Sequence, residues 1–181
     1  MDTTQNVLLT AEEADALRSR MRDLQAAVSR YYAATSKQGN FESELRAFIT
    51  HTQAINDLLT EAIANRTSFK IALESQGEDA KKLLDAIKYI RNIDQHLLYS
   101  VTPDSENVRI VGGSFGFRFF PVWKSIPLAV HDRLRSSTRK LQPAFNDRLV
   151  GREISGSMME VLRLLGALIP EAVHRDGNNE W

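Results

Sequence analysis

The chain has 181 residues, of which 43% are hydrophobic, with 23 basic side chains balanced by 23 acidic ones and no cysteine. This composition is typical of one globular domain with a substantial core, and it excludes a generally disordered chain, disulfides and thiolate chemistry. No apolar run approaches the length of a membrane-spanning helix, and the first residues lack the basic and apolar regions of a signal peptide. We therefore expect a single cytoplasmic domain over 1–181 that contacts no membrane and ends in a loose tail at 176–181.

The net charge of zero conceals an uneven distribution along the chain. Residues 107–152 contain nine basic and two acidic side chains, a formal charge of +7, so the remainder carries −7. Such a basic block predicts a surface for a polyanion, or a contact with the acidic part of a partner subunit. The alternative is that these arginines solvate helix faces and pair with acids that folding brings near.

Two long helices are predicted in the first part of the chain. Thr10 and Glu13 have the spacing of a capping box, and apolar residues then recur in steps of three and four, which predicts a helix over 11–34. A turn-forming cluster follows at 36–40, and a second apolar stripe predicts a helix over 41–65. Residues 66–77 fit either a strand or a short helix.

The middle of the chain predicts a third helix and a β-hairpin. The helix runs over 78–101 and is stopped by Pro103. Two strands are then expected at 108–111 and 114–119, folded at Gly112-Gly113, so that the inserted hairpin lies near 108–119.

The last part of the chain predicts further helices. One runs over 125–141, a short piece follows Pro143, and a second capping box, from Ser157 to Glu160, opens the final helix up to Pro170. The expected fold is therefore all-α, a helical bundle of four to five main helices with one inserted β-hairpin.

The richest chemistry lies on the third helix, in the run Ile90-Arg91-Asn92-Ile93-Asp94-Gln95-His96. An arginine, an amide and an imidazole can together hold a phosphodiester and move a proton near neutral pH. On a helix Asn92 and His96 lie about 40° apart, whereas Arg91 lies about 140° from His96. A single copy therefore presents the arginine and the histidine out of phase, which suits a two-fold interface where two copies pool their groups.

Arg91, followed by the polar Asn92 and then His96 after four further positions, resembles the Arg, polar residue, His signature of the HEPN domains. The resemblance covers about ten residues and the general helical architecture. It implies a small helical bundle that acts as a homodimer with a composite active site. Many members are endoribonucleases of toxin–antitoxin, abortive-infection and RNA-degradation systems, so RNA is the implied substrate and an antitoxin protein is a possible partner.

The resemblance also implies a role for each residue of the signature. Arg91 would bind or stabilise the scissile phosphate, and His96 would act as base on a ribose 2′-hydroxyl or as acid on the leaving oxygen. Asn92 would orient the phosphate or the histidine ring. Such a mechanism leaves a cyclic phosphate and needs no metal or other cofactor, and the sequence contains no cluster with metal-ligand spacing.

Other residues and other functions remain open. Arg46 and His51 repeat the arginine–histidine spacing on the second helix but lack the amide, and His131, Arg135 and Arg139 share a helix face that could contact RNA. The main alternative is a non-catalytic dimeric helical module that binds nucleic acid or a partner protein. A helical DNA-binding regulator is a third interpretation, although no short helix-turn-helix signature is present.

Overall fold

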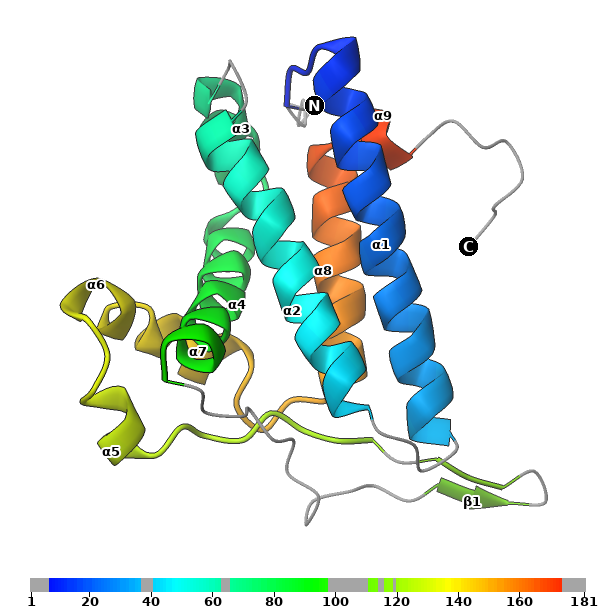
Figure 1. The fold of residues 1–181 in the computed structure, drawn as a ribbon, viewed down its shortest axis with the longest axis vertical. Helices are drawn as coiled ribbons and strands as arrows, with labels where there is room; N and C mark the ends of the chain where they lie inside the picture. Colours follow the sequence, from blue (N-terminus) through cyan, green and yellow to red (C-terminus); the bar gives the residue numbers. More distant parts are fainter. Residues whose placement is uncertain are drawn as a thin grey trace.

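The computed structural model describes residues 7–36, 41–62, 66–97, 111–113, 116–118 and 120–173, and these are predominantly helical (Figure 1). The predicted all-α class is confirmed. The predicted number of four to five main helices is inexact, because several short helices accompany the long ones. The long helices are α1 (Ala11–Ser36), α2 (Glu42–Asp57), α4 (Glu78–Leu97) and α8 (Ile154–Leu168). The shorter ones are η1 (Leu58–Ala62), α3 (Arg66–Ser75), α5 (Leu128–His131), α6 (Ser136–Arg139), α7 (Gln142–Arg148) and α9 (Pro170–Val173).

Helix α1 begins with the predicted capping box. The backbone N–H of Thr10 donates to Glu13 Oε2 at 2.8 Å, and the N–H of Glu13 donates to Thr10 Oγ1 at 3.2 Å. These two bonds satisfy amides that a helix start leaves without partners. The predicted apolar stripe of α1 is buried, and it packs against α2 and α8: Leu17, Met21, Leu24, Val28 and Tyr31.

Residues 66–75, for which the sequence allowed a strand or a helix, form α3. Phe69 and Ala72 are buried while Ile71 is 43% exposed, so the burial follows the helical period and not the alternation of a strand. Helix α3 and the following turn at Gly77, whose φ is 88°, reverse the chain between α2 and α4.

The β-hairpin predicted near 108–119 is not found as predicted. A short antiparallel ladder joins β1 (Val111–Gly113) to β2 (Gly116–Arg118), with Gly112 opposite Phe117 and Gly113 opposite Gly116. Both glycines therefore lie within strand β1, and the prediction that the chain turns at this pair is wrong. The predicted pairs of Ile110 with Phe115 and of Val108 with Phe117 involve residues outside the described ones, as does the expected tail at 176–181.

The predicted helix over 125–141 is wrong, because two short helices stand in its place. Arg135 has an extended backbone (φ −63°, ψ 149°) at the start of α6, which breaks the helix after α5. Two serines and a threonine follow it in α6, and residues of these types are weaker helix formers in the interior of a helix than at its start. We call residues 128–140 the basic lobe; in Figure 1 it lies at the side of α4 away from α1.

The second predicted capping box is also wrong. Helix α8 begins at Ile154, and the extended Glu153 (ψ 132°) occupies the N-cap position. Ser157 is buried one turn inside the helix, where its hydroxyl donates to the Glu153 carbonyl at 3.0 Å.

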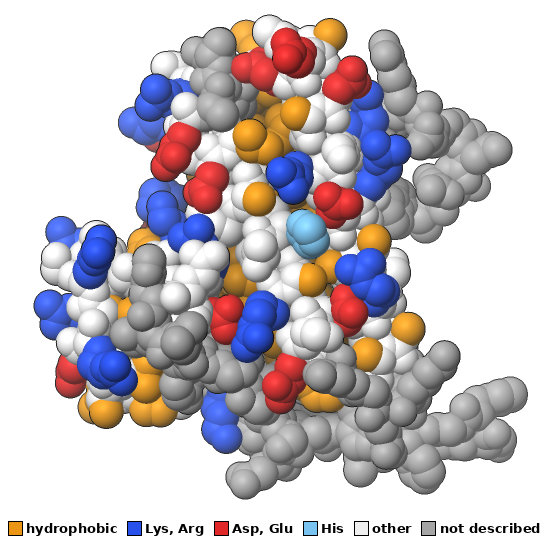
Figure 2. All heavy atoms as spheres, in the orientation of Figure 1, with side chains coloured by type: hydrophobic (Ala, Val, Ile, Leu, Met, Phe, Trp, Pro, Cys, Tyr) orange, Lys and Arg blue, Asp and Glu red, His pale blue; other side chains and the backbone are white. Residues whose placement is uncertain are grey.

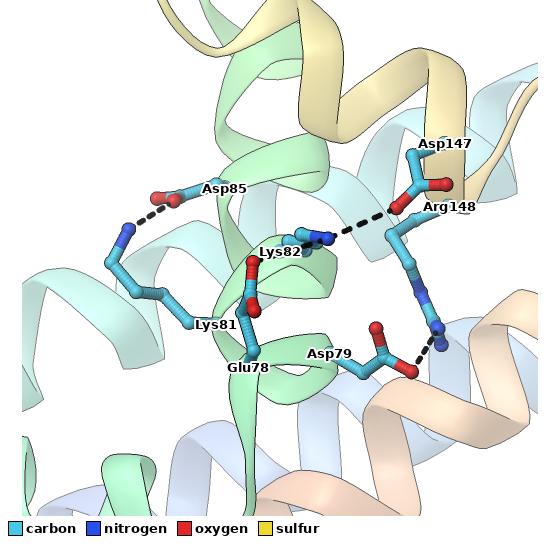
Figure 3. A network of polar contacts seen from close by, with 7 residues as sticks. All are labelled: Glu78, Asp79, Lys81, Lys82, Asp85, Asp147 and Arg148. Carbon is cyan, nitrogen blue, oxygen red and sulfur yellow. Dashed lines mark hydrogen bonds and ion pairs between the residues drawn. The ribbon is translucent and has the colours of Figure 1, made fainter.

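A buried arginine joins α7 to α4 and α8. Arg148 is 8% exposed and forms ion pairs with Asp79 on α4, at 3.0 Å, and with Glu160 on α8. Figure 3 shows the neighbouring contact of Lys82 with Asp147, at 3.4 Å, which links the same two helices α4 and α7. These pairs fix the position of α7 against the helix that carries the candidate site.

Replacing Arg148 with Ala is expected to lower the free energy of unfolding by about 2 kcal/mol. This is less than a fully buried pair would lose, because Asp79 and Glu160 are exposed enough to be solvated once the guanidinium is gone. Lys81→Ala is the matched control, since the Lys81 side chain is 67% exposed and its pair with Asp85 lies within one helix, and it should change stability by less than about 0.5 kcal/mol. Urea unfolding measures both, and equal effects would contradict a structural role for Arg148.

Candidate functional site

Helix α4 carries all three residues of the predicted catalytic set. It is anchored around them by Ile90 and Ile93, which are fully buried, so the turn that presents Arg91 and Asn92 is held against the core. His96 lies in the last turn of α4 by its backbone, and its side chain is outside the described part of the structure. The structure therefore places Arg91 and Asn92 by their contacts, and His96 only by its position on the helix.

Asn92 is buried between α4 and α6. Its side chain is committed at both ends: Nδ2 donates to Thr138 Oγ1 at 3.3 Å, and Oδ1 accepts from Arg91 Nη1 at 3.3 Å. At 9% exposure it has little room to meet a ligand directly. In the described geometry Asn92 therefore holds the half-buried Arg91. The sequence had instead suggested that Asn92 orients a phosphate or the histidine ring.

Arg46, from the second arginine–histidine pair, meets the motif on α4. Its Nε lies 3.1 Å from Asp94 Oδ1, so that α2 and α4 are joined at this level. His51 is half-buried further along α2. Residues five positions apart on a helix point about 140° away from each other, so Arg46 and His51 do not form one site on α2.

Exposed cations surround the Asn92–Thr138 contact. Lys88 is exposed one turn before Asn92 on α4, and Arg135 and Arg139 flank Thr138 on the basic lobe. The lobe also exposes Arg133 and Lys140, and Figure 2 shows basic side chains gathered over the corner that α5 and α6 occupy. Within the described residues none of these five cations has an ion-pair partner.

The carboxylates on this part of α4 are already neutralised. Asp85 pairs with Lys81 at 2.6 Å, and Asp94 pairs with Arg46 at 3.1 Å. Asp132 is the acidic residue of the lobe itself, and it is exposed. Among the residues that the structure describes, this surface therefore has an excess of positive charge, as the +7 block predicts, and the arginines of the basic lobe have no acidic partner there.

His131, a predicted RNA contact, is fixed to the bundle. Its Nδ1 lies 3.0 Å from the hydroxyl of Tyr89, a fully buried residue of α4 whose ring contacts Phe145 at a centroid distance of 5.3 Å. Burial raises the pKa of Tyr89 from 10.0 to about 12, because the phenolate form would lose its hydration. The contact attaches α5 to α4 and occupies one ring nitrogen of His131.

Thr138 is the member of this site that the sequence analysis missed. Its signal was nonetheless present, since Leu134, Thr138 and Leu141 follow at steps of four and three and so fall on one helical face. A hydroxyl within an apolar stripe needs a buried partner, which here is Asn92.

The free energy of unfolding is expected to fall as the pH rises from about 10 to about 12, and to fall less in Tyr89→Phe. The unfolded chain ionises this tyrosine at its ordinary pKa, whereas the folded chain keeps it neutral up to about 12, so the contribution of Tyr89 is complete below pH 10 and is lost above it. Urea unfolding at about pH 9 and about pH 11 measures how far the free energy of unfolding falls between these pH values in the wild type and in Tyr89→Phe. Equal losses in both proteins would contradict the burial of this hydroxyl.

The described residues contain no group of three His, Asp or Glu side chains placed to hold a metal ion. None of the described helices is long and apolar enough to span a membrane. Comparisons with models of protein families, with curated proteins and with solved structures find no match for this chain.

Proposed function

We propose that this protein binds RNA on its basic lobe and cleaves it without a metal ion, in the manner of the HEPN endoribonucleases. The observation that carries the proposal is the hydrogen bond between Asn92 and Thr138. It joins the basic lobe, with its exposed cations, to the turn of α4 that presents Arg91. An RNA strand bound by these cations would therefore lie beside Arg91. RNA supplies both the phosphates that such a surface attracts and the 2′-hydroxyl that the reaction requires.

Each proposed role follows from the chemistry of its side chain. The guanidinium of Arg91 is always charged and offers several N–H donors in one plane, which suits the non-bridging oxygens of a phosphodiester. His96 takes the proton from the 2′-hydroxyl, whose oxygen attacks phosphorus, and the bond to the 5′-oxygen breaks. A proton returned to that oxygen completes the cleavage, which leaves a 2′,3′-cyclic phosphate and a 5′-hydroxyl.

The proposed active unit is a homodimer. On a regular helix, positions 91 and 96 lie about 140° apart around the axis, so one copy of α4 is poorly suited to bring both residues to the same phosphate. Two copies of α4 related by a two-fold axis supply an arginine from one chain and a histidine from the other. By the resemblance to HEPN proteins, the proposed setting is toxin–antitoxin or phage-defence biology, with an antitoxin as the protein partner.

The purified protein is expected to cleave structured RNA in the presence of EDTA and to lose this activity on Arg91→Ala or His96→Ala. Each substitution removes a group that the reaction needs, and circular dichroism should show an unchanged helical content. The products are checked for cyclic phosphate ends by their resistance to ligation and to alkaline phosphatase. His51→Ala is the matched control, because it removes the histidine of the second, similarly spaced pair, and it should leave the rate unchanged.

Undiminished cleavage by a folded His96→Ala protein would overturn the assigned mechanism. The same assay also tests whether the active site is shared between two chains. Mixing the Arg91→Ala and His96→Ala proteins should restore part of the activity, since the mixed dimer holds one intact arginine and one intact histidine across its interface.

A non-catalytic RNA-binding module is the second candidate, favoured by the burial of Asn92 and by the exposed cations of the lobe, which have no ion-pair partner among the described residues. Both candidates share the binding surface, and only the first requires turnover. RNA binding without cleavage under any of these conditions would favour the second.

Affinity for single-stranded RNA is expected to fall steeply with salt, and the slope should shrink by about 0.7 for each phosphate contact removed. Arg135→Ala and Arg139→Ala should each weaken binding and reduce the slope. Arg22→Ala, an exposed arginine on α1 away from the lobe, is the control and should leave both quantities unchanged. Fluorescence anisotropy over a salt series measures them, and an unchanged slope in the double variant of Arg135 and Arg139 would remove the lobe from the binding surface.

A further inference from the structure

The amide of Asn92 has one orientation that satisfies both of its neighbours. A guanidinium has donors and no acceptor, so Arg91 Nη1 requires the Oδ1 end, and the Nδ2 end must then face Thr138. The hydroxyl oxygen of Thr138 accepts from Nδ2. Arg91, Asn92 and Thr138 thus form a directed chain of hydrogen bonds from α4 to α6.

Reversing the amide would place its NH₂ group against the guanidinium. Two sets of donors would then face each other in a half-buried site, and neither would be satisfied. Removing the oxygen of Thr138 removes the partner that keeps the amide in place, since Nδ2 would be buried without an acceptor. The side chain of Asn92 would turn to find one, and Oδ1 would leave Arg91.

We infer that Thr138 is a positioning residue for Arg91 and acts through the amide of Asn92. It touches no substrate in this arrangement; it fixes which end of the amide meets the guanidinium, and so fixes where the guanidinium points. The catalytic consequence of this inference rests on the function proposed above, whereas the orientation of Arg91 does not.

The same chain couples the position of the basic lobe to the proposed active site. Thr138 lies on α6 between Arg135 and Arg139, the two residues proposed to bind phosphates. The lobe must be seated on α4 for Thr138 to reach Asn92. Seating of the lobe is therefore a condition for the orientation of Arg91.

The direct test is the signal of the Arg91 Nη1–H proton that bonds Asn92, in a ¹⁵N-resolved NMR spectrum recorded at low temperature and assigned by its absence in Arg91→Lys. In the wild type this proton should be visible and protected from exchange with water. Thr138→Val keeps the shape of the side chain but removes the oxygen, so the Arg91 signal should shift and exchange at least about tenfold faster, the equivalent of one net hydrogen bond. Thr138→Ser retains the oxygen and should preserve the wild-type signal.

A second buried threonine provides the control. Thr52 on α2 is 1% exposed, and its hydroxyl has no hydrogen-bond partner in the part of the chain that the structure describes. Thr52→Val is therefore the same chemical change without the loss of a contact, and it should leave the Arg91 signal and the stability unaffected.

Kinetics of RNA cleavage give the second measurement. Thr138→Val should lower kcat about tenfold with KM nearly unchanged, because it acts on the orientation of a group that is needed in the transition state. Arg135→Ala should instead raise KM, and Thr138→Ser should restore kcat.

The outcomes separate the inference from the proposed function. An Arg91 signal that is identical in Thr138→Val and wild type would overturn the positioning role, whatever the activity. A wild-type protein that cleaves no RNA would overturn the proposed function, and the NMR comparison would still decide whether Thr138 orients Arg91.

Discussion

A polar amide placed between helices must find hydrogen-bond partners, and the site of this protein is organised around that requirement. Asn92 is buried where α4 meets α6, and it has two partners: Arg91 beside it and Thr138 across the helix boundary. The arginine is thereby held at the surface, and the basic lobe, which exposes Arg133, Arg135, Arg139 and Lys140, is tied to the same turn. The remaining features of the site lie around this contact: the exposed Lys88 on α4, and the carboxylates of Asp85 and Asp94, each of which has a basic partner.

The acidic side chains of α4 near the site form ion pairs with basic residues of the same chain. Asp94 and Asp85 each have a basic partner, and Asp79 is bound to the buried Arg148. The arginines of the basic lobe have no such partner among the described residues. A protein with no net charge can therefore present a cationic surface, since it is the pairing of charges and not their sum that decides the local field.

Most of the bundle could be predicted from the sequence, because its signals are local and strong. The capping box at Thr10 and the apolar stripe of α1 gave the first helix, and the periodicity of α4 placed Arg91, Asn92 and His96 on one element. The failures have local causes as well. Gly112-Gly113 is a favourable turn pair, but the ladder uses it as a strand, and the apolar spacing over 125–141 does not reveal the extended backbone at Arg135.

The candidate site could be predicted less fully, because its decisive contact joins residues far apart in the chain. Thr138 is 46 positions from Asn92, and no spacing rule connects them. Its place on an apolar stripe suggested burial but not a partner. The same applies to Tyr89 and His131, whose contact depends on how α5 folds back onto α4.

The way in which the basic lobe is attached to the bundle affects how easily the candidate site is disrupted. The two short helices are held by the buried Leu134 and by the contacts of Thr138 and His131, and they extend no long helix of the bundle. Segments attached in this way open at lower free energies than the core around them. Transient detachment would uncover Asn92 and release Arg91 while α1, α2, α4 and α8 remain folded, so the arrangement of the candidate site would be lost at milder stress than the bundle itself.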